Sequence, residues 1–134
     1  MMLNGALAGL VAITAEPLTP SPMTAIFIGA VGSIIMYFGT KMLESFGLDD
    51  VVGAIPVHMF AGIFGTLVVP LTNGDTSFGT QFVGTISVVA FSFVLSYGVF
   101  YTLKSTIGLR ISKEAEKLGT DKAEIGVVAY SIRD

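Results

Sequence analysis

Residues 51–71 have the sequence VVGAIPVHMFAGIFGTLVVPL, and this stretch contains no Asp, Glu, Lys or Arg. It is long enough to cross a bilayer, because a membrane-spanning helix needs about 20 largely apolar residues for a hydrocarbon layer of roughly 30 Å. Uncharged stretches at 23–40 and 81–103 flank it on the two sides. This pattern predicts three complete membrane-spanning helices.

A fourth apolar segment precedes them at about 4–15 and is shorter than the roughly 17 residues that spanning usually takes. We expect it to be a helix whose beginning is missing. Three prolines at 16–22, an Asn-Gly pair with Asp75 at 70–79, and the polar run ESFGLDD at 44–50 predict the connecting loops. The fold class is therefore expected to be all-α integral membrane, with segments at about 4–15, 23–43, 51–71 and 81–104.

The composition agrees with a membrane protein and excludes several functions. Of the 134 residues, 52% are hydrophobic and only 13% are charged, whereas a soluble domain carries roughly 25% charged residues. The net charge of −3 gives no basic footprint for nucleic acid. Cysteine is absent, and no phosphate-binding glycine loop, nucleophile elbow or metal-ligand motif occurs. We therefore expect no enzyme activity, no cofactor and no metal.

The basic residues predict the orientation of the chain, because cytoplasmic loops collect Lys and Arg. If all four segments cross the membrane, all the basic residues fall on one side. The loops at 16–22 and 70–80 contain no Lys or Arg and are expected to face outward. The polar tail, 109–134, is expected in the cytoplasm, where Ser112 could cap a short helix. The basic residues are Lys41, Lys104, Arg110, Lys113, Lys117, Lys122 and Arg133.

His58 is the one histidine of the chain, and it lies deep within one of the three uncharged stretches. An ionisable group inside a membrane is costly and is usually functional or paired with another group. A neutral imidazole has one donor and one acceptor nitrogen, so it can relay a proton or hold a polar solute. An alternative of equal weight is that His58 has a structural role alone and forms a hydrogen bond to another helix. At helical spacing it shares a small-residue face that is expected to point toward protein: Ala54, His58, Ala61, Gly62 and Gly65.

Three further residues near this histidine have expected structural roles. Asp49 and Asp50 stand at the start of the helix, where a carboxylate caps free N–H groups and interacts favourably with the helix dipole. A metal or acid–base site formed by this pair is the alternative. Pro56 has no N–H to donate, so it is expected to leave the carbonyl of Val52 unpaired and to kink the helix.

Three stretches then resemble the ammonium transporter family: NGALAGLVAIT at 4–14, DDVVGAIPVHMFAGIFGTL at 49–67 and GLRIS at 108–112. The resemblance covers nearly the whole chain, with Ala129 and Tyr130 supporting it from the tail. In that family eleven helices form one subunit of a trimer with a cytoplasmic C-terminus. The resemblance implies that residues 1–108 are the last four helices of this fold, three of them complete and one truncated.

The resemblance also implies a role for His58, as the second of two histidines that share a hydrogen bond and line the pore. Ammonium is deprotonated at the outer mouth in the usual account, and ammonia passes the histidines. Ala54 would lie on the same substrate path. The residues expected to support the site structurally are Asp49, Asp50, Pro56, Gly62 and Gly65.

The expected partners follow from the same resemblance: ammonium or ammonia, the lipid bilayer and two further copies in a homotrimer. A PII-type regulatory protein at the tail is a weaker implication, because Ile125-Gly126 stands where relatives often have a histidine-glycine pair. The first pore histidine, the aromatic gate and the outer recruitment site belong to the N-terminal part of the family and are absent. This chain alone is therefore expected not to transport ammonium.

Two other functions remain open from the residues alone. One is a complete small transporter of four helices, acting as a dimer, although the interiors of its three complete stretches carry no charge. The other is a non-transporting membrane subunit that assembles with a separately encoded first half. Transport of labelled methylammonium by the purified chain would favour the first, and co-purification with such a half would favour the second.

Overall fold

The computed structural model describes residues 1–128, and all its regular elements are helical. Among these residues there is no β-strand, which confirms the predicted all-α class. The elements, in chain order, are α1 (Met2–Thr14), α2 (Pro22–Ser45), η1 (Ile55–Phe60), α3 (Ala61–Val68), η2 (Val69–Leu71), α4 (Phe78–Thr106), α5 (Lys113–Leu118) and η3 (Asp121–Ile125).

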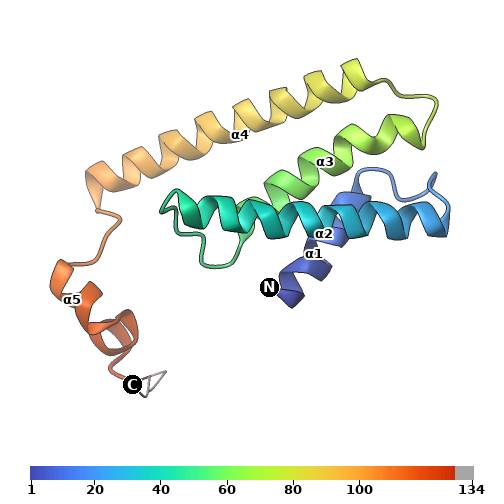
Figure 1. The fold of residues 1–134 in the computed structure, drawn as a ribbon. Helices are drawn as coiled ribbons and strands as arrows, with labels where there is room; N and C mark the ends of the chain where they lie inside the picture. The colour runs from blue at the N-terminus through green and yellow to red at the C-terminus, as the bar shows by residue number, and fades with distance from the viewer. Residues whose placement is uncertain (129–134) are drawn as a thin grey trace. The chain divides into compact units, whose positions relative to one another are not determined.

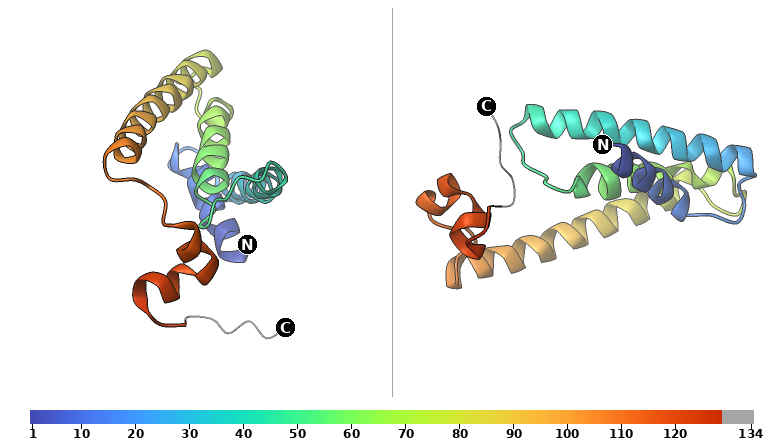
Figure 2. Two further views of the ribbon diagram at one scale, coloured as in Figure 1. Left: turned by 90° about the vertical axis from the view of Figure 1, so that its left-hand side faces the viewer. Right: turned by 90° about the horizontal axis from the view of Figure 1, so that it is seen from below.

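Two compact units make up the chain, residues 1–90 and residues 91–134, and α4 runs from the first into the second. In the first unit, α1 crosses α2, and α3 packs against both of them (Figures 1 and 2). The buried core of this unit consists of Ala8, Met36, Val57 and Ala61, with Val11 packed against it. Each of the three helices, together with η1, therefore contributes to one small core.

Small residues let the first two helices approach closely. A Cβ added to Gly9 would lie 3.1 Å from the carbonyl oxygen of Gly29, and one added to Gly32 would lie 2.6 Å from the Cβ of Ala12. The hydroxyl of Ser33 donates to the carbonyl oxygen of Gly5 at 2.7 Å, which adds a polar link between the helices. Packing of this kind, by small residues and interhelical hydrogen bonds, is typical of helices in a bilayer.

Two helices, α2 and α4, are long and apolar enough to cross a membrane by length and composition. The other two apolar helical segments, Met2–Thr14 and Ile55–Leu71, are shorter. Ser21 caps α2, because its hydroxyl accepts from the N–H of Thr24 at 3.2 Å. Pro22 follows at the first helical position, where its missing N–H has no cost.

In the second unit, the end of α4 is followed by the short helix α5 and the turn η3. Ser112 caps α5, as predicted, by accepting from the N–H of Ala115 at 3.1 Å. Arg110 forms an exposed ion pair with Glu116 at 3.6 Å. The tail residues Ala129, Tyr130 and Arg133, which entered the sequence argument, lie outside the described residues.

Candidate functional site

His58 lies in η1, a π-helical turn that leads directly into α3. The N–H of Ala61, at the end of this turn, donates to the carbonyl oxygens of Pro56 and His58. The bond to Pro56 spans five residues instead of the usual four. Such wide turns are rare, and they occur frequently at functional sites.

The predicted small-residue face is divided by this turn. Ala61 and Gly65 are buried, as expected of a protein-facing position, but Ala54 and His58 are exposed. His58 therefore does not pack against α1, α2 or α3, and that it faces a further part of the protein stays a prediction. A spacing of 3.6 residues does not carry across a π turn. The buried positions are Pro56 and a row at every fourth residue: Gly53, Val57, Ala61, Gly65 and Val69.

Gly65 belongs to this buried row and lies directly on α1. A Cβ added to it would overlap the carbonyl oxygen of Ala12. Gly62, one turn earlier, is less tightly enclosed, because an added Cβ would meet only Val11, at 3.6 Å. Of the two glycines named as structural support, Gly65 thus sets how closely α3 approaches α1.

Asp50 caps the helix that carries His58, as predicted. Its Oδ1 accepts from the N–H of Ala54 at 2.9 Å, and its Oδ2 accepts from the N–H of Ile55 at 2.8 Å. Gly53 has a φ of +74°, which side chains rarely adopt, and its N–H donates to the carbonyl oxygen of Asp50 at 3.1 Å to close the turn before the helix. Both carboxylate oxygens are occupied, so the cap accounts for the whole of this side chain.

Pro56 and the carbonyl of Val52 do not behave as the sequence predicted. Because the helix begins after Gly53, Pro56 lies in its first turn, where a missing N–H is tolerated. The carbonyl oxygen of Val52 does have a partner, the side-chain amide of Asn4, whose Nδ2 donates to it at 3.0 Å. This bond joins residues far apart in the sequence, and only an unpaired polar side chain near the start of α1 could have hinted at it.

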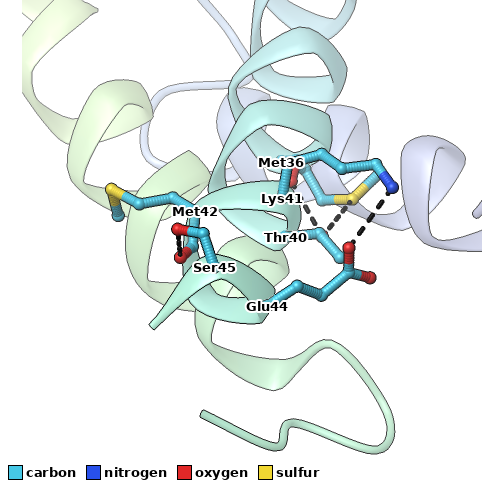
Figure 3. Close-up of polar contacts among 6 residues, drawn as sticks. All are labelled: Met36, Thr40, Lys41, Met42, Glu44 and Ser45. Atoms are coloured by element: carbon cyan, nitrogen blue, oxygen red, sulfur yellow. Dashed lines mark hydrogen bonds and ion pairs between the residues drawn. The ribbon is translucent and has the colours of Figure 1, made fainter. Parts of the chain in front are cut away.

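Asp49 is exposed and lies beside a cavity of about 120 Å³ between the end of α2 and the start of η1. Figure 3 shows the adjoining end of α2, where the polar contacts drawn stay within the helix: Lys41 pairs with Glu44 at 3.2 Å, and Thr40 donates to the carbonyl oxygen of Met36. The residues that line the cavity are Thr40, Leu43, Glu44, Leu48, Asp49, Asp50, Gly53 and Pro56.

The metal-site alternative for the aspartate pair has no support in residues 1–128. Within that part of the chain, no group of three His, Cys, Asp or Glu side chains is placed so that it could hold a metal ion. Asp50 is already used for capping. Asp50 therefore caps the start of the helix beside the exposed Asp49, and the two carboxylates do not form a set of metal ligands.

The loops at the other end of the first unit are linked to each other. The Nδ2 of Asn73, in the loop after η2, donates to the Oε2 of Glu16, in the loop after α1, at 3.0 Å. The loop before α2 and the loop before α4 therefore lie at one end of the helices. Asn4, near the start of α1, and Val52, before η1, are joined by their own hydrogen bond and lie together at the opposite end of the unit.

Comparison with known proteins identifies relatives along nearly the whole chain. The model of the ammonium transporter family matches residues 1–130. An ammonium transporter of Archaeoglobus fulgidus is 40% identical over 150 residues, which cover 97% of this chain and 32% of that protein. One from Methanocaldococcus jannaschii is 34% identical over 139 residues, covering 95% of this chain and 32% of that protein. The chain thus spans about a third of the length of these curated relatives.

Proposed function

This chain belongs to the ammonium transporter family, and from that premise we propose that it forms part of a membrane path for ammonium or ammonia. The proposal is carried by one observation: the sole histidine of a chain that matches the family throughout is held on an ordered turn with its ring exposed. The relatives are named as transporters and not as enzymes.

His58 is the residue proposed to contact the permeating molecule. Its ring lies outside the packing of α1, α2 and α3, where the buried residues nearest to it in the chain are Pro56, Val57 and Ala61. An imidazole in an apolar environment offers one donor and one acceptor, which suits ammonia or a transferred proton. Ala54, exposed like His58 and four residues before it, would line the same path.

A second histidine is required by this proposal, and it comes from the portion of the family fold outside these 134 residues. The exposed position of His58 supports this pairing, because a ring turned away from its own helices is free to meet another element. The four helical segments would be the last four of an eleven-helix subunit, with three of them complete. Assembly of such subunits into a homotrimer belongs to the same proposal.

For the orientation, we propose that the C-terminal tail is cytoplasmic and that the cell membrane is the location. The link between Glu16 and Asn73 supports a common side for the two loops without Lys or Arg. Lys41 and Lys104, near the far ends of α2 and α4, then fall on the opposite side, as the distribution of basic residues in membrane proteins requires. A PII-type protein is the proposed, weaker partner of the tail.

Transport by a chimera tests the function. Residues 1–134 replace the matching third of the Archaeoglobus fulgidus transporter, and uptake of labelled methylammonium is measured in proteoliposomes. We expect the chimera to transport, and we expect His58→Ala to change its rate or its selectivity against other cations. Met59→Ala is the matched control, because Met59 is the exposed neighbour of His58 on the same turn.

Equal transport and equal selectivity in the chimera and its His58→Ala variant would remove the histidine from the mechanism. Residues 1–134 are also reconstituted alone. Uptake by that chain without the remainder of a transporter would instead support a small self-sufficient transporter, and it would overturn the proposal of a shared path.

A further inference from the structure

The start of the helix that carries His58 is fixed from two sides. On one side, the carboxylate of Asp50 holds the N–H groups of Ala54 and Ile55. On the other side, the amide of Asn4 in α1 holds the carbonyl oxygen of Val52, immediately before Gly53. The first contact is local, whereas the second ties this helix start to a different helix.

Asn4 and Gly53 fit together with no spare room. A Cβ built on Gly53 would lie 2.5 Å from the Nδ2 of Asn4, which is closer than such atoms approach in proteins. Gly53 also has a positive φ that side chains rarely adopt. Position 53 therefore has room for a glycine beside the amide of Asn4, and not for a larger residue.

The far end of the same helix is fixed separately by α1. Gly65 lies against the carbonyl of Ala12, and Ala61 is fully buried in the core. Between this contact and the Asn4 contact lies η1, where the bond from the N–H of Ala61 to the carbonyl of Pro56 spans five residues. The π turn thus lies between two points at which one helix is attached to α1.

We propose that Asn4 is a positioning residue for His58, and that its hydrogen bond to Val52 maintains the π turn that exposes the imidazole. The two attachments to α1 leave one residue too many for an ordinary α-helical turn, and η1 takes up the surplus. Without the Asn4 bond, the start of the helix is free to rotate and the π turn relaxes into an α-helix. A spacing of 3.6 residues then carries His58 toward the side of Ala61 and Gly65. This role rests on the proposed function of His58.

The test uses the full chain in detergent micelles and needs no transport, so it can fail independently of the proposed function. Because the chain has one histidine, modification by diethylpyrocarbonate, followed through the absorbance of the modified imidazole, reports on His58 alone. We expect Asn4→Ala to slow this reaction several-fold, because the ring turns toward α1. Asn4→Gln, which keeps an amide donor, should restore at least part of the wild-type rate.

The matched control is Ser33→Ala. Ser33 also donates across to α1, to the carbonyl of Gly5, and its other hydrogen bond goes to the carbonyl of Gly29 in its own helix. An Asn4→Ala rate equal to that of wild type would overturn the proposal. So would equal slowing by Asn4→Ala and Ser33→Ala, because Asn4 would then act only through general packing of α1.

Gly53→Ala provides a second route to the same answer if Asn4→Ala does not fold. The new Cβ displaces the amide while Asn4 itself stays in place, so the modification of His58 should again slow several-fold. An unchanged rate in Gly53→Ala would overturn the proposal. In the double variant with Asn4→Ala, the added effect of Gly53→Ala should be smaller, since the clash with Nδ2 is gone; a fully additive effect would also overturn it.

Discussion

The region formed by α1, α2 and α3 is comparable to helix α4 in apolar content. The two differ in burial, because the first region buries residues between its helices and α4 does not. In the first region, small residues let the helices come into contact: Ala8, Ala12, Gly32 and Gly65 are all buried. By contrast, none of the residues in α4 is buried in the described chain. Apolar content therefore does not separate the two regions, whereas the position of small residues does.

The aromatic residues of α4 show the same contrast. Phe93, Tyr97 and Tyr101 stack on one another along one side of the helix, with ring centroids 6.2 Å apart in each pair. All three are exposed by more than half. Rings of this size on the surface of a helix suit contact with lipid or with further protein, whereas glycine and alanine suit a close helix crossing.

The largest effect is expected from Gly65→Leu. A side chain at this position overlaps the backbone of α1 at Ala12, so the two helices must separate, at a cost of about 3 kcal/mol in the free energy of unfolding. The measurement is unfolding of the chain in mixed micelles by a denaturing detergent. Gly84→Leu on α4 is the control, because a Cβ there meets nothing within 4 Å. Equal losses in the two variants would contradict the contrast.

A large side chain removed from the core should have the next largest effect. Met36 is 3% exposed, so we expect Met36→Ala to lower the unfolding free energy by at least about 2 kcal/mol through lost burial and a cavity. Tyr97→Ala on α4 removes a larger side chain that is 64% exposed. Its cost should stay below about 1 kcal/mol. A greater loss from Tyr97→Ala would show that α4 is held by contacts that its exposure does not reveal.

Removal of the cap at the start of η1 should have a moderate effect. We expect Asp50→Ala to cost about 1 kcal/mol, because two backbone N–H groups lose their acceptor. The neighbouring Asp49 is exposed, and Asp49→Ala should stay within about 0.5 kcal/mol of wild type. Thermal unfolding monitored by circular dichroism distinguishes them, and a reversed order would reassign the cap.

The smallest difference is expected for two serines. Ser33→Ala removes an interhelical hydrogen bond, which is worth about 0.6 kcal/mol in a membrane protein. Ser87 on α4 donates instead to Val83 of its own helix, so Ser87→Ala should change stability less. The detergent unfolding assay compares the two. A larger loss from Ser87→Ala would place a packing partner on α4.

Features that depend on local sequence were predictable. The apolar runs predicted helices, and the aspartate and serine residues at the starts of η1 and α5 predicted caps that the structure confirms for Asp50 and Ser112. These features depend on residues within a few positions of one another. The position of a cap follows from the short reach of its side chain.

Features that depend on distant residues were not predictable. The bond between Asn4 and Val52 joins two helices, and no periodicity in either one specifies it. The π turn at His58 lies between contacts at the two ends of the helix, and a regular spacing of 3.6 residues does not reproduce it. The π turn lies next to glycines that pack closely against another helix, and a local sequence pattern does not specify such contacts between helices.

The proposed role of His58 is tested most directly by asking whether its exposed side meets the first pore histidine, which the family resemblance places outside these 134 residues. The chain contains no cysteine, so His58→Cys can be paired with a cysteine in place of the pore histidine in the remainder of a cysteine-free Archaeoglobus fulgidus transporter. A disulfide requires the two Cβ atoms to approach to about 4 Å. We predict rapid oxidative cross-linking with His58→Cys and little with Met59→Cys; equal or faster cross-linking from Met59→Cys would contradict the account.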